Sequence, residues 1–184
     1  MRVDDLIHSE ENREELLILV ERCSQFFVEA EGRPLLKNLP ADYDDFHKVK
    51  VRKRQLKGDD KEFTETFNDA FEDELRDLRE RAVFSNGTVS FEPADTQEQE
   101  PFYIFPIDGF RFLYSREVEN SSNEYKTLFD TIFEEFGAVR GNEVITDLLK
   151  FTYTGNTLHE GIDSGSEIII YNISYFYAIR AETV

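Results

Sequence analysis

The basic run at residues 48–57 is a first place where residue types could do chemistry. It holds six of the 21 lysine and arginine residues, Arg52 and Arg54 among them, in a chain of formal net charge −18. One interpretation is a solvated loop that offsets the acidic surface. The other is a local anion site for a phosphate group, a nucleotide or an acidic partner, because clustered cations create a positive potential. Arg52 and Arg54 are therefore candidate binding residues.

Glu167 is the candidate catalytic residue. It follows the turn Ser164-Gly165-Ser166 and opens the apolar segment Ile168-Ile169-Ile170. A glutamate at the end of a strand is usually exposed and inert. A carboxylate can, however, also stabilise positive charge that develops in a transition state. The setting of Glu167 suits either interpretation.

Other familiar site signatures do not occur in the sequence. His8, His47 and His159 are far apart, and no Cys/His spacing resembles a zinc site, so no metal site is predicted. There is no phosphate-binding glycine-rich loop and no Gly-x-Ser-x-Gly elbow. The segment Gly161-Ile162-Asp163-Ser164-Gly165 is interpreted as a turn, since its serine does not stand at the centre.

The composition indicates a single folded domain. With 184 residues the chain is long enough for a substantial core, and 40% hydrophobic content with 17 Phe and 8 Tyr argues against intrinsic disorder. Cys23 cannot form an internal disulfide and is predicted to be a small buried hydrophobe. The acidic N-terminus does not resemble a signal peptide, and no apolar run approaches membrane-spanning length. We therefore expect a soluble protein, intracellular or packaged in a particle.

Apolar residues recur at helical spacing in four segments: about 10–30, about 60–79, 121–136 and 143–151. Asp59 or Asp60 suits the N-cap of the second helix. The third begins with the capping box Ser121-Ser122-Asn123-Glu124 and is expected to end at Gly137. The faces expected to pack inward are Leu16, Leu17, Val20, Cys23, Phe26 and Phe27 in the first helix; Phe63, Phe67, Phe71, Leu75 and Leu78 in the second; and Tyr125, Leu128, Phe129, Ile132, Phe133 and Phe136 in the third.

Strands are predicted at 33–39, 82–85, 102–107 and 110–115, and at 167–180 as two strands or one bent strand. Asp108-Gly109 is expected to join the middle pair as a hairpin. Residues 41–58 show no clear periodicity, and 88–100 should form an exposed loop. The fold class predicted is α+β, with a bent pair of small antiparallel or mixed sheets flanked by Phe-rich helices. Ile169 is expected in its core. Residues 1–32 would be an N-terminal helical segment on a core at 33–184.

The order of these segments is similar to that of an uncharacterised group of tailed-phage proteins that look like mono-ADP-ribosyltransferases. The resemblance covers roughly residues 33–180. It includes Gly32-Arg33-Pro34-Leu35-Leu36-Lys37-Asn38-Leu39-Pro40, the basic run and the strand that ends near Asn86-Gly87. Its best parts are Phe105-Pro106-Ile107-Asp108-Gly109-Phe110 and Ser164-Gly165-Ser166-Glu167-Ile168.

The resemblance implies an ADP-ribosyltransferase-like fold with NAD as the substrate. By position, Lys37 replaces the arginine that grips the NAD phosphates, Ser85 lies in the strand that scaffolds the pocket, and Glu167 is the catalytic carboxylate. Three departures follow. Lys37 lacks the planar fork of arginine. Asn38 replaces a glycine that lets the backbone approach the ligand. Gly165 stands where arginine-modifying members carry a second Glu or Gln.

Three functions are compatible with these residues. The first is an ADP-ribosyltransferase acting on a host protein. The second is a catalytically degenerate, non-enzymatic phage protein on the same fold, either a virion component or an acidic inhibitor that binds a host or phage protein. The third is a mimic of DNA charge, although so acidic a chain does not favour nucleic acid itself as a partner. The first two imply a protein partner, no membrane, and the host cytoplasm or the virion. The first also requires Lys37, Ser85 and Glu167 to converge.

Overall fold

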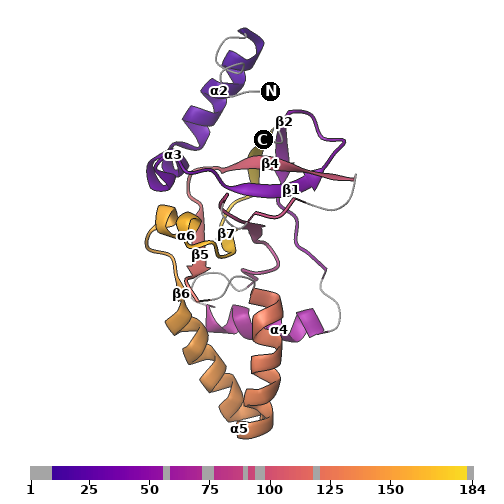
Figure 1. Ribbon diagram of the computed structural model, residues 1–184, viewed down its shortest axis with the longest axis vertical. Helices are drawn as coiled ribbons and strands as arrows, with labels where there is room; N and C mark the ends of the chain where they lie inside the picture. Colours follow the sequence, from indigo (N-terminus) through magenta and orange to yellow (C-terminus); the bar gives the residue numbers. More distant parts are fainter. Residues whose placement is uncertain are drawn as a thin grey trace.

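The computed structural model describes residues 10–55, 59–71, 77–88, 91–93, 98–117 and 121–181, without the side chains of 10–12, 59–60, 62 and 121–126. This part of the chain forms two small antiparallel sheets and five helices, so the predicted α+β class is confirmed. The sheets lie one beyond the other along the long axis, with α2 (Glu10–Arg22) at one end and α5 (Ser121–Thr152) at the other (Figure 1).

The remaining helices are α3 (Ser24–Ala30), α4 (Asp59–Ala70) and α6 (Leu158–Ser164). The first sheet has the strand order β1 (Leu36–Pro40), β4 (Gln99–Pro106), β8 (Tyr175–Arg180) and β2 (Phe46–Lys50). The second has the order β3 (Val83–Ser85), β7 (Ile168–Tyr171), β5 (Arg111–Ser115) and β6 (Tyr153–Thr154). Every paired neighbour is antiparallel.

The two sheets meet where β1 lies beside β3. The backbone N–H of Leu36 donates to the carbonyl of Asn86 at 2.8 Å, and the N–H of Asn86 donates back at 3.1 Å. Because β3 in turn pairs with β7, the three strands β1, β3 and β7 follow one another side by side.

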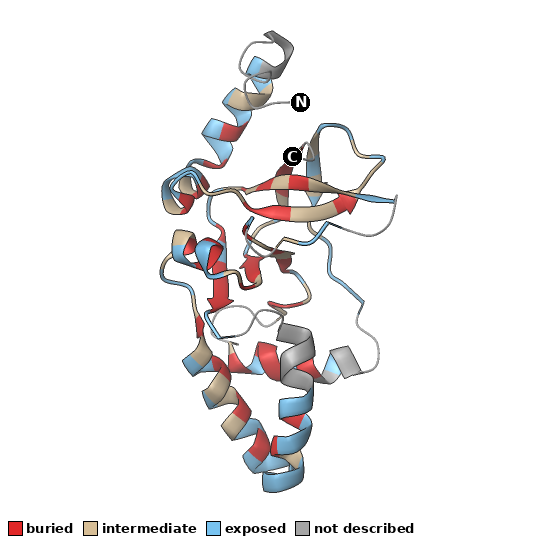
Figure 2. Cartoon of the chain, in the orientation of Figure 1, coloured by how far each residue is buried: buried red, intermediate tan, exposed pale blue. Residues whose placement is uncertain are grey.

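Strand β7 divides the core into two hydrophobic clusters. Ile168 and Ile170 belong to the cluster that includes α3, the first sheet and α6, whereas Ile169 and Tyr171 belong to the cluster that includes α4 and α5. Alternate residues of a strand point to opposite faces, so a continuous apolar run results when both faces are covered. All residues of β7 are buried, in the middle of the molecule (Figure 2).

The predicted hairpin at Asp108-Gly109 is wrong, because β4 and β5 belong to different sheets. Asp108 accepts hydrogen bonds from the hydroxyl of Ser24 and the N–H of Gln25, both at 2.8 Å, and Gly109 donates its N–H to the side chain of Gln25. Gly109 also has a φ of 89°, which favours glycine. The turn is therefore built around the start of α3, and it carries the chain from one sheet to the other.

The helix expected at 10–30 breaks at Cys23 into α2 and α3. Its buried residues are Leu19, Cys23, Phe26 and Ala30. Leu17, Val20 and Phe27 were expected inside, but their exposed fractions are 62%, 61% and 40%. The break prevents one continuous stripe from packing, so part of the apolar face stays outside. The burial of Cys23 is confirmed.

The second predicted helix ends at Ala70 rather than near 79, and Leu78 is buried from a separate turn at 77–80. Leu75 lies outside the described residues. Phe67, Phe129, Ile132 and Ile169 are buried as predicted. Phe71 and Phe133 are only partly buried, because each lies at the margin of the second cluster.

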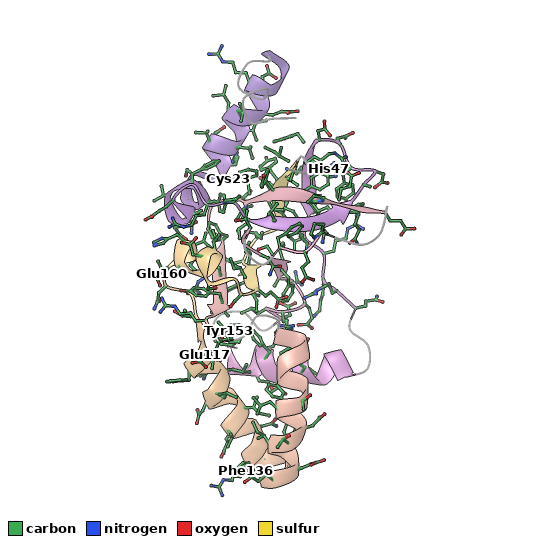
Figure 3. The ribbon with its side chains drawn as sticks, in the orientation of Figure 1. Cys23, His47, Glu117, Phe136, Tyr153 and Glu160 are labelled. Carbon is green, nitrogen blue, oxygen red and sulfur yellow. The ribbon has the colours of Figure 1, made fainter. Side chains whose placement is uncertain are left out.

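Helix α5 contains both of the later predicted helices. It is bent at Gly137, whose φ of 73° and ψ of 168° are not helical, so the predicted stop is confirmed as a sharp kink. Phe136 lies next to this kink, where the two arms of α5 meet, and is 37% exposed (Figure 3). Leu128 is 40% exposed, although both residues were expected inside. The expected capping side chains of α4 and α5, and Tyr125, lie outside the described side chains.

Three elements were not predicted: β2, the two-residue strand β6, and α6. Strand β2 occupies residues where no periodicity was evident. It is an edge strand without a buried residue, and its Lys48 and Lys50 are exposed, as lysines on edge strands commonly are. The segment interpreted as a turn at 161–165 instead completes α6, which ends at Gly165 with a φ of 80°. Within the described residues, no helix is long and apolar enough to cross a membrane.

Candidate functional site

Lys37, Ser85 and Glu167 come together at the junction of the two sheets. Lys37 is in β1, Ser85 ends β3, and Glu167 immediately precedes β7. Ser85 is opposite Ile168 in the β3–β7 pair, and its buried hydroxyl donates a long hydrogen bond, 3.4 Å, to the carbonyl of Ile168. The lateral order β1–β3–β7 therefore brings three residues that are distant in sequence into one region.

Lys37 is a half-buried cation held by the main chain of β3. Its Nζ donates to the carbonyl oxygen of Phe84 at 2.8 Å. Burial is the main cause that lowers the pKa of Lys37 to about 8, and the charge of Arg54 lowers it further, whereas the charge of Glu167 opposes the shift. Arg54 and Glu167 are therefore the two charged side chains that act on Lys37 in addition to its burial.

Arg54 reaches the same phenylalanine from the basic run. Its guanidinium carbon lies 4.2 Å from the centre of the Phe84 ring, and its Nη2 donates to the carbonyl of Arg79 at 2.6 Å. Arg79 is only 4% exposed, and its guanidinium carbon lies 4.8 Å from the Phe84 ring. Phe84 thus contacts a lysine through its carbonyl and two arginines through its ring.

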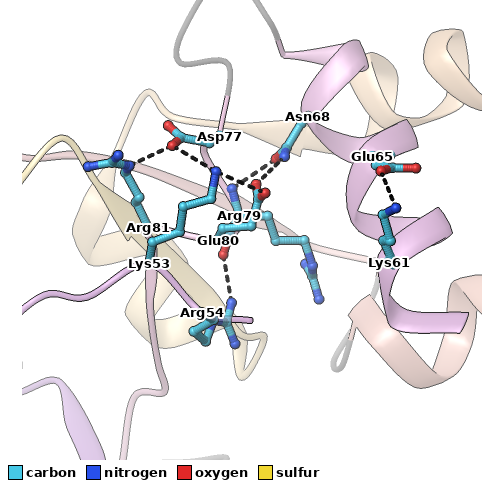
Figure 4. Close-up of polar contacts among 9 residues, drawn as sticks. All are labelled: Lys53, Arg54, Lys61, Glu65, Asn68, Asp77, Arg79, Glu80 and Arg81. Carbon is cyan, nitrogen blue, oxygen red and sulfur yellow. Dashed lines mark hydrogen bonds and ion pairs between the residues drawn. The ribbon is translucent and has the colours of Figure 1, made fainter. Parts of the chain in front are cut away.

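A polar network fixes the backbone that carries Arg54 (Figure 4). The side chain of Asn68 in α4 accepts from the N–H of Arg79 at 2.9 Å and donates to Glu80 at 2.5 Å. Glu80 pairs with Lys53 at 3.5 Å, and its carbonyl accepts the N–H of Arg54 at 2.9 Å. These contacts join α4, the turn at 77–80 and the segment after β2, so the position of Arg54 is set by tertiary structure.

The other described cations of the basic run do not contact Phe84: Lys53 pairs with Asp77 and Glu80. Arg52 is exposed. Lys48, in β2, has its Nζ 3.8 Å from the centre of the Tyr175 ring. Lys57 lies outside the described residues. Arg54 is the member of the run that contacts Phe84, whose carbonyl accepts from Lys37, so the structure brings Arg54, and not Arg52, to the candidate site.

Asn38 and Gly165, the two other positions singled out in the sequence, also have structural counterparts. The Nδ2 of Asn38 donates to the carbonyl of Glu92 at 2.9 Å, while its Oδ1 is buried with no hydrogen-bond partner. The side chain therefore fills space beside β1 that a glycine would leave open. Gly165 caps α6 in the left-handed conformation and offers no side chain next to Glu167.

Sequence reasoning missed Phe84 and Arg79. Phe84 is flanked in β3 by the buried residues Val83 and Ser85, so alternation could have assigned its side chain to the opposite face. Arg79 fell in a stretch that was expected to continue a helix, and nothing in its local pattern indicates burial against aromatic rings.

A separate cavity of about 710 Å³ lies between α4 and α5. Glu65, Asp69, Asp130 and Glu134 line it, so it does not suit an anionic nucleotide. In the described part of the chain, no group of three or more His, Cys, Asp and Glu side chains could hold a metal ion. The cationic region around Phe84 is therefore the better candidate for an anionic ligand.

Comparison of the chain with protein-family models found no match, and neither the curated proteins nor the solved structures gave a significant match. The site is therefore interpreted from its own geometry. Two cations and one carboxylate come together where the two sheets of this α+β protein meet.

Proposed function

We propose that this is a phage-encoded, ADP-ribosyltransferase-like protein that binds NAD at the junction of its sheets and modifies a host or phage protein. The observation that supports it is the convergence of Lys37, Ser85 and Glu167 from β1, β3 and the start of β7. The resemblance assigns these positions to the phosphates, the pocket scaffold and the reacting sugar. Two sheets that meet at this point support the same assignment.

Glu167 would act on the ribose of NAD. The bond between the ribose carbon and the nicotinamide nitrogen breaks, and its electron pair leaves with nicotinamide. The carboxylate stabilises the positive charge that develops on the sugar. A nucleophile of the target protein then bonds to the same carbon and loses its proton to solvent. Ser85 positions the start of β7 through its contact with Ile168.

A second candidate is a non-enzymatic interaction protein on the same fold, either a virion component or an acidic inhibitor. The observation that favours it is the surroundings of β1. The Nζ of Lys37 already donates to Phe84, and Asn38 occupies the space where a glycine would admit a ligand. Gly165 also gives no group that could activate an acceptor.

The test is incubation of the protein with labelled NAD and host lysate, with nicotinamide release and labelled protein as readouts. Glu167→Gln should lower the rate about 100- to 1000-fold, because it keeps the side-chain shape but removes the charge that stabilises the sugar cation. Glu143→Gln is the matched control, since Glu143 is exposed on α5, and it should leave the rate unchanged.

Wild-type protein that neither binds nor cleaves NAD would contradict the transferase proposal and support the interaction protein. Equal rates for wild type and Glu167→Gln would refute the role of this carboxylate.

A further inference from the structure

We propose that Lys37 and Arg54 form a split cation site that recognises the diphosphate group of a nucleotide, with Phe84 as the support between them. The proposal rests on the proposed function for the kind of ligand, but it requires no catalysis. It assigns to Arg54 the phosphate contact that a single arginine in β1 would otherwise make.

The two cations belong to different elements and share one residue. Lys37 comes from β1 and contacts the carbonyl of Phe84, whereas Arg54 follows β2 and stacks on the Phe84 ring. Arg54 is further anchored through the carbonyl of Arg79. The separation of the cations is thus set by the protein before any ligand binds, and such preorganisation lowers the cost of binding.

The local charge favours an anion although the whole chain is strongly acidic. Lys37 and Arg54 are like charges that both contact Phe84, and the burial of Lys37 adds to the cost of holding both. Glu167 is the carboxylate that acts on Lys37 from the β7 side, and Glu80 pairs with Lys53, the residue before Arg54. The buried Arg79 adds a further cation against the same ring. A bound dianion would relieve this repulsion.

The chemistry of the two side chains points to two linked phosphates. Guanidinium can bind a phosphate through paired N–H donors, whereas the ammonium of lysine acts as a point charge. Each phosphate can therefore meet one cation. Lys37 alone cannot reproduce the grip of an arginine, but Lys37 and Arg54 together can hold a diphosphate.

The experiment is calorimetric titration of the full chain with inorganic pyrophosphate and, separately, with ADP-ribose. Arg54→Gln should weaken both ligands about 10- to 100-fold, the worth of one charge-assisted hydrogen bond. Arg52→Gln is the matched control, since it removes the same charge from an exposed position in the same segment, and it should change affinity less than about twofold.

Arg54→Lys keeps the charge but not the planar fork, and it should fall between wild type and Arg54→Gln. Circular dichroism of each variant checks that the fold is intact. Equal weakening by Arg52→Gln and Arg54→Gln would overturn the proposal, because general charge would then explain the effect. Absence of pyrophosphate binding by the wild type would overturn it as well.

Protonation of Lys37 gives a second readout. Its charged neighbours are Arg54, which stays charged, and Glu167, so the affinity for ADP-ribose should fall as pH rises through about 8. This loss should be missing in Lys37→Met. A wild-type affinity that stays constant from about pH 7 to about pH 9.5 would contradict the assignment of Lys37.

The two proposals fail in different ways. If Arg54→Gln weakens pyrophosphate binding and the wild type never cleaves NAD, the transferase proposal fails and the split site stands. If wild type and Arg54→Gln bind NAD with equal affinity and both cleave it, the split site fails and the transferase proposal stands. Glu167→Gln should retain pyrophosphate binding, since its carboxylate is not a phosphate contact.

Discussion

Lys37 carries a positive charge in surroundings that disfavour that charge. Its ammonium group is half-buried, next to the charge of Arg54, and satisfied by a main-chain carbonyl rather than by a paired carboxylate. Both burial and a neighbouring cation disfavour the charged form of a lysine. A position that keeps a cation under these conditions is a functional candidate on physical grounds.

We therefore expect the stability of the protein to depend on pH through Lys37. Its pKa is about 8 in the folded state against 10.5 ordinarily, so between these values the unfolded chain binds more protons. The free energy of unfolding should consequently rise with pH in this window. Lys37→Met should remove that rise, and exposed Lys50→Met should not, in urea unfolding at about pH 7.5 and about pH 10. Identical pH profiles for wild type and Lys37→Met would refute the shift.

Helices α4 and α5 pack through aromatic side chains to form the second cluster of the core. The Phe63 ring of α4 lies 5.3 Å from the Phe129 ring of α5, and the fully buried Phe67 of α4 lies 5.2 Å from Tyr153 in β6. Arg79 lies over the Phe67 ring at 5.3 Å, so the same helix also supports the cationic region. Packing of α4 and the geometry of the candidate site are therefore linked.

Phe67→Ala should lower the free energy of unfolding by about 3–5 kcal/mol, because it removes a large buried ring and leaves a cavity. Phe151 is 83% exposed on α5, and Phe151→Ala should change stability by no more than about 0.5 kcal/mol. Denaturant unfolding followed by circular dichroism measures both. Comparable losses in the two variants would contradict the assignment of the buried face.

Charge is the dominant property of the whole molecule. A net charge of −18 on 184 residues creates repulsion that disfavours the compact state. Ion pairs such as Arg33–Asp163 and Lys53–Asp77 act against it. Many of these pairs are partly exposed, so each contributes little. A cationic site within such a surface is correspondingly distinct for an approaching anion.

Added salt should therefore stabilise the protein. Raising NaCl from about 0.02 to about 0.2 M shortens the Debye length to below about 10 Å and screens repulsion across the surface. The thermal midpoint at neutral pH should rise, with KCl giving the same increase. A midpoint that falls with salt would show that attractive ion pairs outweigh the net repulsion.

The parts of the candidate site that could be predicted were those carried by short segments. Glu167 stands immediately before an apolar run, and Lys37 and Ser85 lie in segments that were expected to be strands, so their elements were correctly anticipated. Arg52 and Arg54 were indistinguishable in sequence, since both are cations in the same run. Only the contacts of Arg54 with Phe84 and Arg79 separate them.

By itself the sequence determined the α+β class, the buried run of β7, the burial of Cys23 and the break at Gly137. These depend on periodicity and on local backbone preference, which are read from neighbouring residues. The tertiary structure decided which sheet each strand joins, because β4 and β5 are separated by the contacts of Asp108 with Ser24 and Gln25. It also decided that β1, β3 and β7 lie side by side. Strand partners are chosen by contacts between distant segments, which no local pattern contains.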